Sequence, residues 1–317
     1  MRLVFLGSPP FALPVFDRVL TGPHDVRALV TQPDRRKGRG RKVQTSLLVE
    51  LAGEHGVEVV QPETTKDPEF VARLRAFEPD VLLVASYGEI LREDVLTAAP
   101  HGALNVHASL LPRWRGASPI QRAILEGDAE TGVTIQRIVK KLDAGDVLHA
   151  LSLTIDERDT SGSLLERLAA LGAQAAAEAL DQLSSGTATF TPQDEAAVTL
   201  APKLTKDDGR IDWQATRAQI DRHVRAMTPW PGARTTLPDG REAVVLEVGV
   251  NEVGLVDQTT PQGTAPGTLL SVEGSMIVAA GDGALEIRRL KPAGKQAMEG
   301  RAFLLGARLE AGSRLGD

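Results

Sequence analysis

Short apolar runs alternate with amphipathic stretches along the first half of the chain. The short runs predict strands at residues 3–7, 26–31, 57–61, 81–85, 103–107, 133–138 and 147–153. Apolar residues that recur every three to four positions predict helices at residues 11–20, 43–55, 68–77, 119–126 and 161–183. Strands that are apolar on both faces and separated by helices are typical of a parallel sheet with helices on both sides. The run at residues 81–85 is the most apolar, so we expect it at the centre of the sheet.

The pattern changes near residue 189, where the periodicity is lost until about residue 208. A helix is expected next at residues 213–227, followed by short apolar runs at 234–237, 243–248, 268–272, 276–280 and 284–289. Evenly spaced strands separated by glycine turns predict a small antiparallel barrel, similar to an oligonucleotide-binding (OB) fold. The sequence therefore predicts an α/β protein with a Rossmann-like, mostly parallel sheet in residues 1–188, a linker in 189–208, and a smaller OB-like antiparallel β-barrel domain in 209–317.

Composition excludes several kinds of chemistry. The chain has no cysteine, so disulfides, thiolate metal ligands and cysteine nucleophiles are absent, and we expect no metal. The first apolar run is too short for a secretion signal, and no stretch approaches the ~20 apolar residues of a membrane span. Gly7 is not followed by the GxGxxG pattern of dinucleotide-binding folds. We therefore expect a cytoplasmic protein without a membrane partner.

Positive charge is concentrated in one segment of an acidic chain. Residues 31–45 contain one acidic residue, Asp34, and six basic residues: Arg35, Arg36, Lys37, Arg39, Arg41 and Lys42. Six minus one gives this segment a charge of +5. Because the whole chain has a net charge of −6, the rest of the chain has a charge of −11. With glycines at positions 38 and 40, this loop is suited to following phosphates along a nucleic acid. A solvated surface loop is the commoner fate of such a charge run.

The candidate chemistry is concentrated in Asn105, His107 and Asp143. Asn105 and His107 are two positions apart on a predicted strand, so their side chains share one face, at the strand end where open parallel sheets bind ligands. Asp143 lies in the turn-like segment LDAGD. An amide donor, an imidazole and a carboxylate suit the attack of a neutral amine on a formyl or acyl carbon. Without a cysteine or a GxSxG elbow, such a transfer needs no covalent enzyme intermediate. Taken singly, an Asn-x-His strand end or an LDAGD turn is more often structural.

The segments NVHASLLPRWRGASPIQRAI and LDAGDVL closely resemble the folate-dependent formyltransferase family. The resemblance extends over nearly the whole chain and includes GSPPFA, TQPDRRKGRGRK, APKLTKDDGRIDW and RAMTPWPGA. It implies that Asn105, His107 and Asp143 are catalytic and that 10-formyltetrahydrofolate is the co-substrate. It also implies that four consecutive residues cradle the tetrahydrofolate: Ser109, Leu110, Leu111 and Pro112.

The linker and the second domain match as well, which implies the branch of the family that formylates initiator Met-tRNA for translation initiation. In this reading the basic loop contacts the acceptor arm of the tRNA, with Arg41 and Lys42 as the preferred contacts, and Lys206 adds a contact from the linker. We expect a monomer. Glycinamide-ribonucleotide and amino-sugar formyltransferases are the enzymatic alternatives. A non-catalytic RNA-binding protein with a vestigial folate site is the alternative from another class.

The chain departs from the family pattern at two places. The family usually has Asp-x-Gly-Leu-Asp where this chain has Val139-Lys140-Lys141-Leu142-Asp143, so an acidic residue and a glycine are missing before the aspartate. Glu89 also stands where an apolar residue is more familiar. We expect the loop before Asp143 to be less flexible and more positive than usual.

Overall fold

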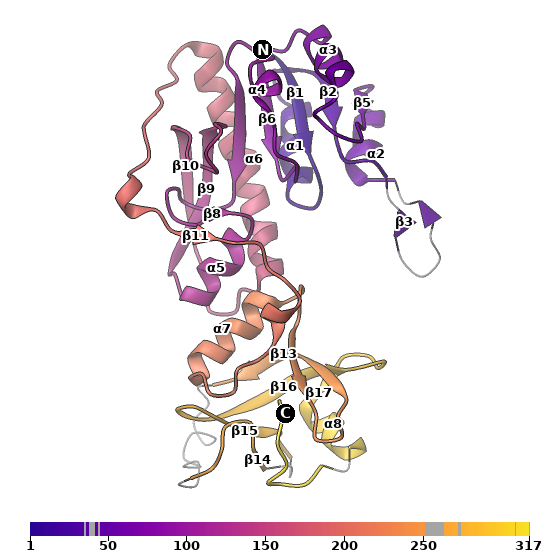
Figure 1. The fold of residues 1–317 in the computed structure, drawn as a ribbon, viewed down its shortest axis with the longest axis vertical. Helices are drawn as coiled ribbons and strands as arrows, with labels where there is room; N and C mark the ends of the chain where they lie inside the picture. The colour runs from indigo at the N-terminus through magenta and orange to yellow at the C-terminus, as the bar shows by residue number, and fades with distance from the viewer. Residues whose placement is uncertain are drawn as a thin grey trace. The chain divides into compact units, whose positions relative to one another are not determined.

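The computed structural model describes residues 1–34, 36–37, 42–43, 45–250, 263–271, 274–307 and 309–316, the two short pieces 36–37 and 42–43 by their backbone alone. The chain forms two compact units (Figure 1). The first unit comprises Met1–Pro119, Glu130–Thr154 and Leu165–Ala201. The second comprises Ile120–Ala129, Ile155–Leu164 and Pro202–Asp317. Two segments within residues 1–188, Ile120–Ala129 and Ile155–Leu164, belong to the second unit, whereas the sequence predicts one domain there. The expected domain boundaries remain a prediction.

A seven-stranded sheet forms the centre of the first unit, with strand order β10-β9-β7-β6-β1-β2-β5. The strands are β1 Arg2–Gly7, β2 Asp25–Val30, β5 Glu58–Val60, β6 Val81–Ala85, β7 Ala103–His107, β9 Glu130–Arg137 and β10 Val147–Thr154. The five strands from β5 to β7 run parallel, whereas β9 is antiparallel to β7 and β10 is antiparallel to β9. The mostly parallel sheet is confirmed, and the apolar run at residues 81–85 lies in the middle of the order as predicted.

Helices cover both faces of this sheet. The helices of the first unit are α1 Ala12–Leu20, α2 Leu47–Glu54, α3 Pro68–Ala76, α4 Glu93–Leu96 and, from Leu165 onward, α6 Ser161–Ser185. The helix α5 Pro119–Glu126 lies mainly in the second unit. One face buries Val4, Leu82 and Ala103 under α3 and α4. On the other face the ring of Phe5 lies 4.9 Å from that of Phe16 on α1. Burial of apolar side chains on both faces explains why these strands show no polar alternation.

Two helix starts differ from the sequence prediction. Residues 43–55 were expected to form one helix, but α2 begins only at Leu47, because the Ser46 side chain accepts the Leu48 N–H and caps it. Lys42–Val43 forms the short strand β4 instead, paired with β3 Arg36–Lys37. The helix expected at 213–227 begins at Arg217, where Thr216 and Gln219 form a capping box.

The second unit contains the antiparallel sheet β12-β13-β16-β15-β14, with β17 paired to β16. Its elements are α7 Arg217–Met227, β12 Ala233–Thr236, β13 Glu242–Gly249, β14 Leu269–Ser271, β15 Ile277–Ala280, β16 Gly283–Pro292, β17 Met298–Glu299 and α8 Gly300–Gly306. Alternate residues of β13 and β16 are buried, as expected for a sheet with one face toward a core. All five predicted apolar runs become strands, which confirms a separate antiparallel domain.

Short elements lie between the larger ones. They are β8 Arg115–Gly116, β11 Leu200–Ala201, and the 3-10 helices η1 Glu195–Ala197 and η2 Asp207–Gly209. The segment expected to be a linker is thus partly structured: β11 runs beside β8 in parallel, both in the first unit (Figure 1). No helix within the described ranges is long and apolar enough to cross a membrane.

Candidate active site

Asn105 and His107 project from the same face of β7, as strand alternation predicts. The antiparallel neighbour β9 places Gln136 opposite Asn105 and Thr134 opposite His107. Residues directly opposite one another in a sheet share a face, so these four polar side chains form one patch among apolar strands. His107, Thr134 and Gln136 are buried, and Asn105 is partly buried.

Asp143 meets this patch from the loop of residues 138–146, between β9 and β10. Its Oδ1 lies 3.5 Å from the Asn105 Nδ2, and its Oδ2 lies 3.8 Å from the His107 Nδ1. The Gln136 amide donates to Oδ1 at 2.9 Å, and the Gly116 backbone N–H donates to Oδ2 at 2.9 Å. The structure therefore brings the three predicted catalytic side chains together. Their roles in a reaction stay a prediction.

A backbone carbonyl determines how His107 holds its proton. The His107 Nε2 lies 3.0 Å from the carbonyl oxygen of Trp114. A carbonyl oxygen only accepts, so Nε2 must carry the hydrogen of this bond. In the neutral imidazole the lone pair is then on Nδ1, the atom that faces Asp143. This arrangement leaves Nδ1 able to take up a proton next to a carboxylate.

The loop that carries Asp143 has an unusual backbone. Asp143 has φ +44°, in the left-handed region that non-glycine residues seldom adopt. Gly145 follows, and a methyl group at its Cα would overlap the carbonyl oxygen of Arg137. A tight approach of this kind is open only to glycine. Gly145 thus permits the close approach, whereas the left-handed backbone of Asp143 depends on the contacts around it.

Residues that the sequence did not single out complete the surroundings of Asp143. Gln136 donates to its carboxylate, and Gln193 donates to its backbone carbonyl at 2.8 Å. Neither glutamine belongs to a recognisable motif. Gln136 could have been found by asking which residue lies opposite Asn105, but Gln193 is fifty positions beyond Asp143 and has no local signal.

The segment expected to cradle the folate follows β7 directly. Thr134 Oγ1 donates to the Ser109 carbonyl at 2.7 Å and accepts the Leu111 N–H at 3.0 Å. Ser109 is fully buried, and its own hydroxyl donates to the Arg113 carbonyl at 2.6 Å. Leu110, Leu111 and Pro112 are partly buried. The segment is thus fastened to β9 beside the three candidate catalytic residues.

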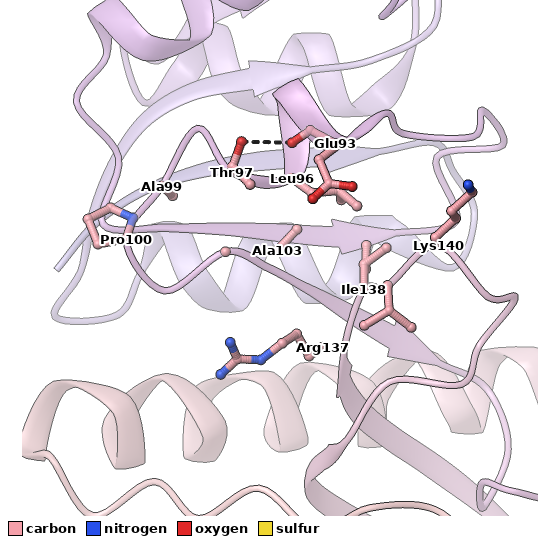
Figure 2. Close-up of a pocket in the computed structure, with 11 residues that line it drawn as sticks. Glu93, Leu96, Thr97, Ala99, Pro100, Ala103, Arg137, Ile138 and Lys140 are labelled. Carbon is pink, nitrogen blue, oxygen red and sulfur yellow. Dashed lines mark hydrogen bonds between the residues drawn. The ribbon is translucent and has the colours of Figure 1, made fainter. Parts of the chain in front are cut away.

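A cavity of about 510 Å³ lies beside β7 (Figure 2). It is lined by Glu93, Leu96, Thr97, Ala99, Pro100, Gly102, Ala103, Arg137, Ile138, Val139 and Lys140. Ala103 precedes Asn105 by two positions on β7, so both residues face the same side of the sheet. Arg137 points to the other side, where its guanidinium lies 4.3 Å from the centre of the Phe190 ring. The cavity includes none of the residues from Ser109 to Pro112.

Both departures from the family pattern have partners in the first unit. Lys141 Nζ lies 2.6 Å from Glu195 Oε2. This bond and that from Arg115 lower the pKa of the Glu195 carboxyl. The Glu89 carboxylate accepts the Thr64 hydroxyl at 2.8 Å and the Thr65 N–H at 3.1 Å. Burial, together with the charge of Glu89, raises the pKa of Tyr87 above its usual value.

The predicted nucleic-acid contacts are placed only in part. Arg35, Arg39 and Arg41 lie outside the described residues, as do the side chains of Arg36, Lys37 and Lys42. Lys206 is exposed in the second unit, where its carbonyl accepts a hydrogen bond from Arg234. Among the described residues, no three His, Asp or Glu side chains gather as a metal site.

A mostly parallel α/β sheet carries an amide, an imidazole and a carboxylate at its rim, a set of groups that can donate to an oxyanion and move a proton. Comparison with known proteins identifies the family. Residues 1–180 match the model described as formyl transferase, and residues 203–308 match its C-terminal domain. The chain therefore belongs to the formyl transferase family and is an enzyme.

Individual relatives agree with the family models. A protein of Methylococcus capsulatus named methionyl-tRNA formyltransferase is 46% identical over 316 residues, covering 100% of both chains. One of the same name from Geobacter metallireducens is 42% identical and covers 100% of this chain and 99% of its own. The structure of HypX from Aquifex aeolicus in complex with tetrahydrofolic acid superposes with a TM-score of 0.61 at 21% identity, over 96% of this chain and 47% of that one. That last similarity shows the fold.

Proposed function

We propose that this enzyme transfers the formyl group of 10-formyltetrahydrofolate to the amino group of methionyl initiator tRNA, giving N-formylmethionyl-tRNA. Full-length similarity to relatives that are named for this activity supports the acceptor. The observation that carries the chemistry is the position of the Asp143 carboxylate, within 4 Å of both the Asn105 amide and the His107 imidazole.

Each of the three side chains has a role that its geometry allows. The co-substrate supplies an electrophilic formyl carbon, which a neutral amine attacks. The Asn105 Nδ2–H can donate to the oxygen on which negative charge develops, and one such donor is worth roughly 3 to 4 kcal/mol. His107 Nδ1 and the Asp143 carboxylate face each other and can receive the proton that the amine must lose. The bond between the formyl carbon and N10 of the co-substrate then breaks, and N10 leaves as tetrahydrofolate with a proton that the same pair can return. Since the amine attacks directly, no covalent enzyme intermediate is required.

The cavity beside Ala103 supports binding of a folate. Its volume of about 510 Å³ is in the range of small-molecule sites. Apolar side chains, Leu96 and Ile138 among them, can contact a flat heterocycle, and Lys140 offers a cation to a carboxylate-bearing tail. We propose that the ring system occupies this cavity and that the segment from Ser109 to Pro112 contacts the part near Asp143. No metal takes part in the proposed reaction.

We propose that tRNA is held by the basic loop of residues 31–45 and by Lys206. We also propose the domain boundaries expected from the sequence. Phosphate contacts from the six cations of the loop and from Lys206 would make binding strongly salt dependent. We further propose that the protein acts as a monomer in the cytoplasm, where its proposed acceptor is used. Neutralising Arg41 and Lys42 should lower the slope of log affinity against log salt by about two. An unchanged slope would place the contacts elsewhere.

Purified protein assayed with 10-formyltetrahydrofolate tests the proposed function. We expect rapid formylation of methionyl initiator tRNA and much slower formylation of methionyl elongator tRNA, glycinamide ribonucleotide and a nucleotide-linked amino sugar. Turnover with the sugar or the ribonucleotide alone would assign the chain to another branch of the family. Tight tRNA binding without turnover of any acceptor would favour the non-catalytic alternative.

A further inference from the structure

The chain between the two regions matched by family models lies directly against the candidate site. Residues 191–201, here called the strap, belong to the first unit. At one end Thr191 exchanges two backbone hydrogen bonds of 2.8 Å with Val147 of β10. At the other end the Thr199 hydroxyl accepts the Trp114 N–H at 2.9 Å, and β11 pairs with β8. The strap is therefore fastened on both sides of the loop that carries Asp143.

Gln193, two positions after Thr191 in the strap, is bonded to the Asp143 loop. Its side-chain nitrogen donates to the carbonyl of Asp143 at 2.8 Å and to that of Gly145 at 2.7 Å. The same nitrogen lies 3.2 Å from the side-chain oxygen of Gln136. Its oxygen accepts the Arg115 Nε–H at 3.0 Å. Three acceptors on one side and a donor on the other allow only one orientation of this amide.

The orientation of Gln193 determines that of Gln136. Because the Gln136 oxygen faces the Gln193 nitrogen, its own nitrogen is turned toward Asp143 Oδ1, to which it donates at 2.9 Å. With the amide reversed, an oxygen would face the carboxylate and the bond would be lost. A chain of two amides thus runs from the strap to the candidate catalytic carboxylate.

Ionic contacts hold the strap itself in place. Arg115 is 2% exposed and donates to both Gln193 and Glu195. Lys141, one of the residues that departs from the family pattern, pairs with the second oxygen of Glu195. The Asp143 loop and the strap are therefore joined by charge as well as by amides.

We infer that Gln193 is a positioning residue, which holds the carboxylate of Asp143 against Asn105 and His107 by bonding the loop backbone and by orienting Gln136. The inference rests on the proposed function, in which that carboxylate takes part in formyl transfer. The left-handed backbone of Asp143 explains why outside bonds are needed, because such a conformation persists only where its surroundings enforce it.

The test compares Gln193→Ala and Gln193→Glu with Gln174→Ala, a matched glutamine that is exposed on α6 and bonds only Glu178 among the described residues. We expect Gln193→Ala to lower kcat about 10- to 100-fold, by analogy with the loss seen when hydrogen-bond partners of metal ligands are removed. The KM for each substrate should change less than about threefold, because the inference assigns this side chain contacts with the protein only. Gln193→Glu should lose at least as much, since a carboxylate would face two carbonyls. Thermal unfolding confirms that each variant is folded.

A double variant shows whether Gln193 acts through Asp143. In an Asp143→Ala background, Gln193→Ala should change the residual rate less than about twofold. A further loss as large as in the wild-type background would overturn the inference. An unchanged kcat in Gln193→Ala would overturn it also.

A measurement without substrate separates this inference from the proposed function. The Gly116 amide donates to Asp143 Oδ2, so its hydrogen exchange reports whether the carboxylate is in place. We expect at least about tenfold faster exchange in Gln193→Ala and none of this change in Gln174→Ala. Unchanged exchange would overturn the positioning role whatever the reaction is. Wild-type turnover in Asp143→Ala would instead discard the proposed chemistry.

Discussion

The two sources of the candidate site, strand β7 and the loop of residues 138–146, hold their side chains by different means. Asn105 and His107 sit on a regular strand between two others, so their direction follows from the ladder of the sheet. Asp143 sits on an irregular loop with a left-handed backbone, and side chains distant in sequence hold it. One half of the site is fixed by secondary structure and the other by specific polar contacts. The first half should therefore tolerate a lost side chain without moving, whereas the second should not.

The largest effect is expected on the strand. His107→Ala should lower kcat for formyl transfer about 10²- to 10⁴-fold, the usual contribution of a positioned acid or base. The fold and the tRNA affinity should be nearly unchanged, because β7 keeps its neighbours on both sides. Steady-state kinetics and a filter-binding assay measure the two quantities. Turnover like that of the wild type would remove His107 from the mechanism.

A smaller but broader effect is expected in the loop. Gly145→Ala places a methyl group against the Arg137 carbonyl, so the loop must shift. We expect a loss of about 1 to 3 kcal/mol in the free energy of unfolding, as for other overpacked sites, together with a lower kcat. Gly53→Ala is the control, because a methyl group there meets open space on α2. Urea unfolding compares the two. If both variants unfold alike, the loop is not as tightly packed as described.

The smallest effect is expected when the pH is lowered, and it concerns the stability of the loop of residues 138–146. The folded-state pKa of Glu195 lies below its ordinary value of 4.5, first because Lys141 donates to it and then because Arg115 does. Its contribution to stability is therefore complete above pH 4.5 and is lost as the pH falls through the lower folded-state pKa. Protection of the 138–146 amides, corrected for intrinsic exchange, should fall slightly between about pH 5 and pH 3, while that of β7 stays level. In Glu195→Gln the loop should lose this dependence. Parallel curves for loop and strand in the wild-type protein would contradict it.

The sequence predicts the strand half of the site well, because that half depends on local periodicity. Alternation alone puts Asn105 and His107 on one face, and the structure agrees. The helix starts were less accurate, although their signals are local: Ser46 caps α2, and Thr216 with Gln219 caps α7. Apolar periodicity extends past such caps, so it placed both starts too early.

The loop half could be predicted only as a motif. LDAGD located Asp143 through family resemblance, but nothing in it indicated a left-handed backbone or a partner at position 193. The strap was interpreted as a linker because the periodic pattern is lost there. Its polar side chains bond the loop and β8, and contacts of this kind leave no periodic trace in one sequence.

The position of the strap has a practical consequence for anyone who shortens or recombines this enzyme. A cut after residue 188 would retain Asn105, His107 and Asp143, and by motif inspection the fragment would look competent. It would nevertheless lack Gln193 and Glu195, which bond the Asp143 loop, and the strand β11, which pairs with β8. Chimeras with a foreign second domain should therefore be joined after Ala201, so that the first unit keeps its own strap.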